Sequence, residues 1–273
     1  MARLSKQQIK LHNQAVKLLE KDELTYDEKV FVFDNWHEAA NHTTKESGAF
    51  FTPLSMAFDF AIDAQGKRII DLCAGIGALA FATYHRHIRT NPEIVCIEKN
   101  PDYVAVGKKL LPEATWICAD VFDLDSLNLG QFDCALSNPP FNKVYRSGSA
   151  KTYTGSKFEY HVIDIASTLA DYGVFILPQM SSSFVLSGGR NYYKDRENKT
   201  AVEFEKLLNI TMECGIGIDT EVFADEWKSK VPTTEIVTIE FKDRFSEGEE
   251  DTTEPETIHV PVEPVFTKQL TFF

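Results

Sequence analysis

The chain has 273 residues, of which 43% are hydrophobic, and it carries a formal net charge of -13. This length suits one α/β domain of ordinary size with modest additions and permits a sizeable core. The negative charge argues against a protein that coats nucleic acid by bulk electrostatic attraction, although it leaves room for local basic patches.

No apolar run approaches the roughly 18 residues of a membrane-spanning helix, and the N-terminal MARLSKQQIK lacks the apolar centre of a secretory signal. The five cysteines contain no CxxC pair and no metal-ligand spacing, so we interpret them as small buried residues in a reducing compartment. We therefore expect a cytoplasmic protein without a metal site.

Residues 1–47 are expected to form an N-terminal helical cap, because apolar residues recur at helical spacing over 5–21 and again over 24–36. The segment GAFFTP follows. Its Pro53 is suited to begin a helix through Phe60, with Thr52 as the N-cap.

The next stretch, RIIDLCAGIGALAFATYHRH, predicts a buried strand over 68–72 and a helix over 78–89. Between them, Asp71 is followed by a small-residue turn that contains Gly75 and Gly77. Glycines let backbone N–H groups approach a ligand, and the helix N-terminus behind them accepts polar or anionic groups. Taken alone, the pattern also fits an NAD enzyme or an ordinary tight turn.

Two further strands, over 94–98 and 115–119, lead to the acids Glu98 and Asp120. In an open parallel sheet the ligand lies across the carboxyl ends of the strands, where these acids would meet Asp71. A carboxylate at the second strand end is placed to accept hydrogen bonds from ribose hydroxyls. A fourth strand, over 132–137, then leads into Asn138-Pro-Pro-Phe141.

With these motifs in this order, the sequence resembles the class I S-adenosylmethionine-dependent methyltransferases, and more narrowly those with an Asn-Pro-Pro-aromatic signature. GAFFTP is similar to the segment that precedes the glycine loop in adenine-N6 DNA methyltransferases, and the motif order is that of their gamma group. The resemblance implies a Rossmann-like, seven-stranded, mostly parallel sheet in the order 3-2-1-4-5-7-6, with helices on both faces. It places the catalytic domain at residues 48–241.

The resemblance also implies site residues. In it, Glu98 matches the ribose-binding acid and Asp120 the acid that contacts the cofactor adenine. The implied catalytic residues are Asn138, Pro139, Pro140 and Phe141. The implied S-adenosylmethionine-binding residues are Phe51, Thr52, Pro53, Asp71, Ala74, Gly75, Gly77, Glu98, Lys99, Asp120, Val121 and Asn138.

An adenine amine is a poor nucleophile because its lone pair is delocalised into the ring. If the Asn138 side-chain oxygen and the Pro139 carbonyl each accept an N–H hydrogen bond, the nitrogen can aim its lone pair at the methyl donor. Phe141 is expected to stack on the substrate ring, and a base inside a duplex would have to be flipped out. The alternative for NPPF is a rigid turn with Phe141 in the core.

Basic and aromatic residues are concentrated in loops near 142–160 and 186–199. We expect nucleic-acid contacts from these loops, and a plain solvated loop is the alternative. The candidate residues are Lys143, Arg146, Lys151, Lys157 and Arg190. Helices are expected over 158–169 and 201–208, a fifth strand over 173–177, and closing antiparallel strands over 216–223 and 235–241.

The tail, residues 242–273, carries three basic residues against eight acids and is expected to be extended or disordered and flexible. Its last residues, QLTFF, resemble the short peptide by which bacterial replication and repair proteins dock on the sliding clamp. Gln269, Leu270, Phe272 and Phe273 are therefore candidate partner-binding residues. The alternative is that their apolar side chains fold back on the protein.

The leading hypothesis is an S-adenosylmethionine-dependent methyltransferase that modifies the N6 amine of adenine in DNA. Many DNA-modifying relatives carry a large target-recognition domain after the catalytic part, and we expect none here, so that short insertions read the target, or specificity is low, or the substrate is not duplex DNA. Three alternatives stay open: an RNA adenine-N6 enzyme, a glutamine-N5 protein methyltransferase, and a non-catalytic adaptor that binds DNA or the clamp.

Overall fold

The computed structural model describes residues 4–37, 50–141, 144–189, 193–194 and 198–241. A central sheet contains six strands: β1 (Arg68–Leu72), β2 (Glu93–Glu98), β3 (Thr115–Cys118), β4 (Phe132–Ser137), β5 (Ala170–Pro178) and β8 (Thr234–Glu240). Their order is β3-β2-β1-β4-β5-β8, and β8 alone runs antiparallel to its neighbour. A separate two-stranded sheet pairs β6 (Phe184–Val185) with β7 (Tyr193–Lys194).

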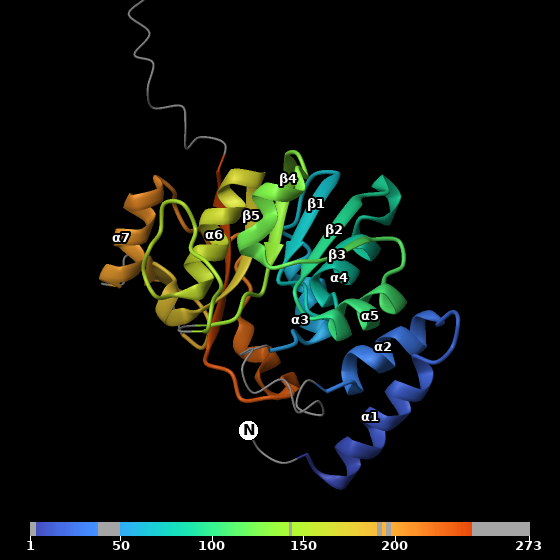
Figure 1. The fold of residues 1–273 in the computed structure, drawn as a ribbon. Helices are drawn as coiled ribbons and strands as arrows, with labels where there is room; N and C mark the ends of the chain where they lie inside the picture. Colours follow the sequence, from blue (N-terminus) through green and yellow to red (C-terminus); the bar gives the residue numbers. More distant parts are fainter. Residues whose placement is uncertain (1–3, 38–49, 142–143, 190–192, 195–197, 242–273) are drawn as a thin grey trace, which may run out of the picture.

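Helices cover both faces of the sheet (Figure 1). One face packs on α3 (Leu54–Phe60), α4 (Ala78–Arg86) and α5 (Pro101–Leu110), and the other on α6 (Phe158–Leu169) and α7 (Lys199–Leu208). The strands divide their side chains by alternation: Ile69 faces the first core, whereas Ile70 and Leu72 face the second. Burial on both faces explains why these strands are continuous apolar runs.

The N-terminal segment forms two helices, α1 (Lys6–Leu18) and α2 (Tyr26–Asn35), and each begins with a capping box. The α2 helix packs on α4 through Phe33, whose ring centroid lies 4.9 Å from that of Phe81. Residues 78–83 of α4 are therefore buried all round, between the sheet and the other helices.

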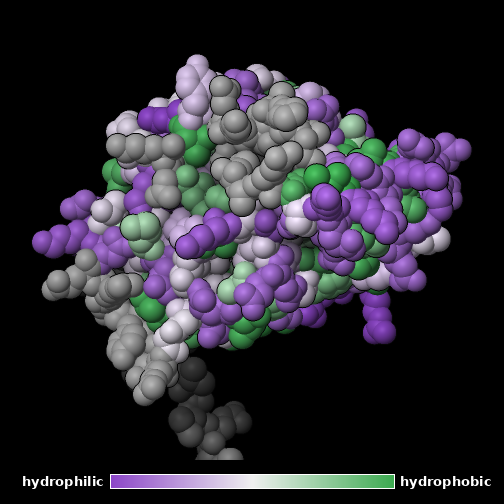
Figure 2. Space-filling view, turned by 90° about the horizontal axis from the view of Figure 1, so that it is seen from below, coloured by the Kyte–Doolittle hydropathy of each residue, from purple (hydrophilic) through white to green (hydrophobic). Residues whose placement is uncertain are grey.

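Short 3₁₀ helices occupy several connections: η3 (Ile88–Thr90), η4 (Val121–Leu127), η5 (Gln179–Ser181) and η6 (Thr220–Glu226). The parallel strands end toward the bottom of Figure 1, and Figure 2 looks onto that end from below. No helix in the described ranges is both long enough and apolar enough to span a membrane.

The α/β class and the sheet order are as predicted, but the seventh strand is not. Residues 216–223 do not form a strand: Gly215 and Gly217 take positive φ angles of 54° and 77°, which end any extended run, and η6 follows. What remains at this edge, within the described chain, is an isolated bridge between Glu213 and Thr238.

Several predicted boundaries also move. The fifth strand begins at Ala170 rather than at 173, and α4 ends at Arg86, before the short η3. Thr52 is not the N-cap of α3: Pro53 occupies that position, and the Thr52 hydroxyl accepts a hydrogen bond from Asn138 instead. The Thr52 side chain is therefore engaged in a tertiary contact rather than in capping the helix.

Candidate active site

A cavity of about 470 Å³ opens at the carboxyl ends of β1, β2, β3 and β4. It brings together the segment before α3, the loop after β1, the ends of β2 and β3, and the turn after β4. Ten of the predicted cofactor-binding residues line it: Phe51, Thr52, Asp71, Ala74, Gly75, Glu98, Lys99, Asp120, Val121 and Asn138. The predicted convergence of acids at one edge of the sheet is therefore present.

The loop after β1 has an unusual backbone. Cys73, Gly75 and Gly77 all have positive φ angles, of 59°, 58° and 89°. A Cβ at Gly75 would lie 3.2 Å from the Phe51 ring, so glycine lets this aromatic side chain close over the loop. Gly77 does not line the cavity, and a Cβ there would lie 2.8 Å from Trp116. Glycine at position 77 therefore makes room for the Trp116 ring in the core.

Asp71 is buried, with 1% of its surface exposed. Its Oδ2 accepts a hydrogen bond of 3.2 Å from the Ala80 backbone N–H of α4, whereas Oδ1 has no partner among the described residues. Burial, opposed by the Ala80 hydrogen bond and assisted by the nearby Glu98, raises the pKa of Asp71 to about 8. A cationic ligand in the cavity would supply the missing partner.

Glu98 joins two elements through its carboxylate. Oε2 accepts a hydrogen bond of 2.9 Å from the Gly75 N–H, and Oε1 accepts one of 2.7 Å from the Asn100 N–H at the start of α5. Burial raises the pKa of Glu98, and these backbone N–H groups oppose the shift. Glu98, the predicted ribose-binding acid, thus also holds the glycine loop against the start of α5.

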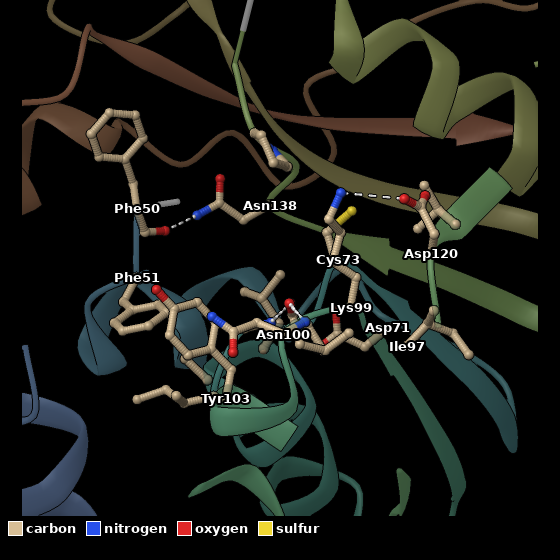
Figure 3. A pocket seen from close by; sticks show the side chains of 18 of the residues that line it. Phe50, Phe51, Asp71, Cys73, Ile97, Lys99, Asn100, Tyr103, Asp120 and Asn138 are labelled. Atoms are coloured by element: carbon tan, nitrogen blue, oxygen red, sulfur yellow. Dashed lines mark hydrogen bonds and ion pairs between the residues drawn. The ribbon is translucent and has the colours of Figure 1, made fainter. Parts of the chain in front are cut away.

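Asp120 lines the cavity just after the end of β3. It accepts hydrogen bonds from the Phe122 N–H at 3.2 Å and the Ser147 hydroxyl at 2.8 Å, and Lys99 Nζ lies 3.3 Å away. The Ser147 contact ties the loop after the NPPF motif to the end of β3. Figure 3 shows the Lys99 contact across the cavity from Asn138.

The Asn138 side chain is held in one orientation. Its Nδ2 donates hydrogen bonds of 2.9 Å to the Phe50 carbonyl and 2.9 Å to the Thr52 hydroxyl (Figure 3). Because a carbonyl oxygen can only accept, the amide nitrogen must face the 50–52 segment, and Oδ1 points the other way. This oxygen is buried and has no partner in the described chain. It can accept a hydrogen bond from a donor group of a ligand in the cavity.

The other residues of the two proline-containing motifs are placed differently. Pro140 lines the cavity, but Pro53, Pro139 and Phe141 do not. The Phe141 ring, 7% exposed, stacks on Phe50 with a centroid distance of 5.8 Å and an interplanar angle of 30°. In this structure Phe50, rather than Phe141, presents an aromatic surface to the cavity.

The basic loop is less open than its sequence suggests. Arg146 contacts His161 and donates to the Ser149 hydroxyl, and Lys151 forms an ion pair of 2.8 Å with Asp125. Lys157 donates to the Met180 carbonyl and the Ser181 hydroxyl, and burial lowers its pKa. These contacts lie within the fold, although the Lys151 and Asp125 side chains stay 69% and 67% exposed. A role of these cations in nucleic-acid binding stays a prediction.

Two of the loop tyrosines lie in the second core. Tyr160 is fully buried and stacks on Phe204 at 4.0 Å, and Tyr153 packs edge-on against it. Tyr145 is different, since it is 86% exposed and lines the cavity. The remaining tentative residues, Lys143, Arg190, Gln269, Leu270, Phe272 and Phe273, lie outside the described residues.

Sequence reasoning missed several lining residues, among them Phe50, Cys73, Asn100, Tyr103 and Tyr145. Phe50 had a signal, because it belongs to GAFFTP. Tyr103 is 2% exposed in the first turn of α5, and its place in the wall arises only when α5 packs beside the 50–52 segment. No group of metal-ligating side chains occurs in the described part of the chain.

Residues 55–154 match the family model of the methyltransferase small domain. The match includes the glycine loop, Glu98, Asp120 and NPPF, and GAFFTP lies just before it. A search of curated proteins finds no match to the chain.

Solved structures share the fold. The methyltransferase subunit of a type I restriction-modification system from Streptococcus thermophilus aligns with a TM-score of 0.50 at 13% identity, over 80% of this chain and 50% of that one. A putative class I S-adenosylmethionine-dependent methyltransferase from Listeria monocytogenes aligns with a TM-score of 0.51 at 12% identity, over 90% and 82%. This chain therefore spans half the length of the Streptococcus subunit.

The cavity fits S-adenosylmethionine chemically. The open oxygen of Asp71 suits a cationic centre, the glycine loop allows close approach of backbone, and aromatic side chains suit a purine ring and a sulfonium. Together with the matched methyltransferase domain and the fold, these groups identify S-adenosylmethionine as the cofactor.

Proposed function

We propose that this chain transfers the methyl group of S-adenosylmethionine to the N6 amine of adenine in DNA. The observation that carries the proposal is the Asn138 amide. Its nitrogen is tied to Phe50 and Thr52, and its buried oxygen keeps an open acceptor position. A side chain held this way suits a substrate that donates an N–H group, as an exocyclic amine does.

The chemistry required of the chain is mainly positioning. S-adenosylmethionine supplies an electrophilic methyl group on a sulfonium. Asn138 Oδ1 and the Pro139 carbonyl would each accept one N–H hydrogen bond from the amine, which directs the nitrogen lone pair toward the cavity interior. The prolines donate no N–H groups that would compete for these acceptors. The bond from nitrogen to the methyl carbon would form as the methyl–sulfur bond breaks, which leaves S-adenosylhomocysteine, and the methylated nitrogen would then lose one N–H proton to solvent.

The Asn138 contacts also suggest why GAFFTP and NPPF occur together. The 50–52 segment contributes the Phe50 carbonyl and the Thr52 hydroxyl, both of which orient the catalytic amide. Phe50 and Tyr145 line the cavity as aromatic surfaces for a planar base. Phe141 would support that base indirectly, by stacking on Phe50.

DNA is favoured by the GAFFTP resemblance, and the Streptococcus relative of the same fold belongs to a restriction-modification system. One observation favours RNA or another unpaired strand as a second candidate. The described basic side chains near the cavity are engaged by Asp125, His161 and backbone groups, which leaves few cations for a duplex backbone.

The experiment is transfer of labelled methyl groups to duplex DNA, single-stranded DNA, RNA and a protein extract, each offered separately. We expect label in DNA, recovered as N6-methyladenine. Label in RNA alone would select the second candidate, and label in glutamine would select the protein methyltransferase. No transfer to any of these, together with no cofactor binding in calorimetry, would favour the non-catalytic adaptor.

The terminal QLTFF segment leads to a separate proposal, that Gln269, Leu270, Phe272 and Phe273 dock on a bacterial sliding clamp. It rests on the sequence resemblance alone. A short apolar anchor at the end of an acidic segment suits such docking, since the tether costs little. Fusing residues 264–273 to a carrier tests it: binding of the clamp supports the idea, and no binding removes it.

A further inference from the structure

The C-terminal end of α2 reaches the wall of the cofactor cavity. Trp36, just past the helix, is 4% exposed. Its ring centroid lies 5.7 Å from that of Phe51 and 5.8 Å from that of Tyr103, edge-on to the latter. Phe51 and Tyr103 in turn lie 5.1 Å apart. The three rings form one cluster, with two members on the cavity and Trp36 behind them.

The two front rings are positioned to meet a ligand. Both line the cavity, and Figure 3 shows them side by side below Phe50. The Phe51 ring also lies over the glycine loop, 3.2 Å from where a Cβ of Gly75 would be. A shift of Phe51 would therefore change the space above the loop itself.

Lys228, which is far from α2 in the sequence, contacts both the end of this helix and the Phe51 ring. Its Nζ donates to the Phe33 carbonyl and, at 2.9 Å, to the Trp36 carbonyl, both at the end of α2. A cation at this position also suits the negative end of the helix dipole. The same Nζ lies 5.7 Å from the centre of the Phe51 ring. One side chain thus contacts both the end of α2 and the cavity wall.

Trp36 is distinct from the residues that merely pack α2 on the domain. Phe33, one turn earlier, contacts Phe81 of α4, and Phe81 does not line the cavity. The same helix therefore offers one aromatic residue that faces the cofactor wall and one that faces ordinary core. Their substitution separates the two roles.

We infer that Trp36 and Lys228 are positioning residues for the cofactor, and that the C-terminal end of α2 belongs to the cofactor site rather than to an accessory cap. Trp36 fixes the Phe51 and Tyr103 rings, and Lys228 fixes Trp36. The inference rests on the assignment of S-adenosylmethionine and is independent of which substrate receives the methyl group.

Calorimetric titration with S-adenosylmethionine tests the inference without an activity assay. For Trp36→Ala we expect roughly 5- to 10-fold weaker affinity, the equivalent of losing aromatic pair contacts, and near-normal affinity for Trp36→Phe. Lys228→Met should weaken affinity about severalfold. Phe33→Leu and Lys230→Met, the matched controls, should stay within about twofold of the unmodified chain.

Thermal unfolding of each variant shows whether it is folded at the titration temperature. If Trp36→Ala does not fold, Lys228→Met decides, because Lys228 is only half-buried. Folded Lys228→Met with unchanged cofactor affinity would overturn the inference. So would a loss in Phe33→Leu as large as that in Trp36→Ala, since the effect would then be general destabilisation.

Discussion

Asn138 and Asp71 share a physical feature: one half of each side chain is tied to the fold, and the other half is a buried oxygen without a partner in the described residues. Leaving a buried acceptor unsatisfied costs about 1–3 kcal/mol. Both oxygens belong to residues that line the same cavity, so a ligand with suitable donors or positive charge would recover that cost.

The role of Thr52 gives a prediction at the scale of one residue. Thr52→Val keeps the shape of the side chain but removes the hydroxyl that accepts from Asn138 Nδ2. We expect the single-turnover methylation rate to fall roughly 2- to 10-fold, because one of two orienting hydrogen bonds is lost. Thr52→Ser, which keeps the hydroxyl, is the control. Equal rates in both variants would show that the amide needs no such support.

Asp71 gives a prediction about pH. Its pKa is raised from 3.8 to about 8 by burial, so the folded state binds the proton more tightly than the unfolded state. The stability it contributes is fully present below pH 3.8 and is lost as pH rises toward 8. The melting temperature of Asp71→Asn minus that of the unmodified chain should therefore grow between pH 5 and 8 and then level off. A constant difference would contradict the raised pKa.

At the scale of elements, Glu98 connects the glycine loop after β1 to the first turn of α5. Glu98→Ala removes an acceptor for two backbone N–H groups as well as the expected ribose contact. We predict cofactor affinity weaker by about 1.5–3 kcal/mol, measured by calorimetry. Glu93→Ala, an exposed acid at the other end of β2, is the matched control. Unchanged affinity in Glu98→Ala would mean that the loop needs no brace.

Elements with clear local signals were predicted at or near their true ends. The strands β1 and β4 and the helix α6 have the predicted bounds. The two strands are short, mostly apolar runs between polar residues, and Asn138 directly follows β4. The strand expected over 216–223 failed because two of its apolar residues, Ile216 and Val222, are exposed and the glycines at 215 and 217 turn the chain. Composition alone does not reveal those φ angles.

The site was predictable to a similar extent and for a similar reason. Asp71, Glu98 and Asp120 follow successive strands, and parallel pairing alone brings them to one edge. The contact of Thr52 with Asn138 joins residues 86 positions apart, so no local pattern predicts it. The same holds for Lys228 on the end of α2.

The whole molecule is acidic, with a net charge of -13. The face seen from below in Figure 2 is largely hydrophilic, with apolar residues scattered among the hydrophilic ones. Since the described loop cations are paired internally, we expect few phosphate contacts. The logarithm of the DNA-binding constant should fall with the logarithm of salt concentration with a slope no steeper than about -3. A slope near -6 or steeper would show an extensive backbone interface.

The central claim is that Asn138 holds the exocyclic amine of adenine for methylation. Mass spectrometry of nucleosides from DNA incubated with the protein and S-adenosylmethionine tests it most directly, with Asn138→Ala in parallel. The account predicts N6-methyldeoxyadenosine from the unmodified chain and at least about 100-fold less from the variant, while calorimetry shows similar cofactor affinity for both. Normal methylation by Asn138→Ala, or no methylated adenine from the unmodified chain, would contradict it.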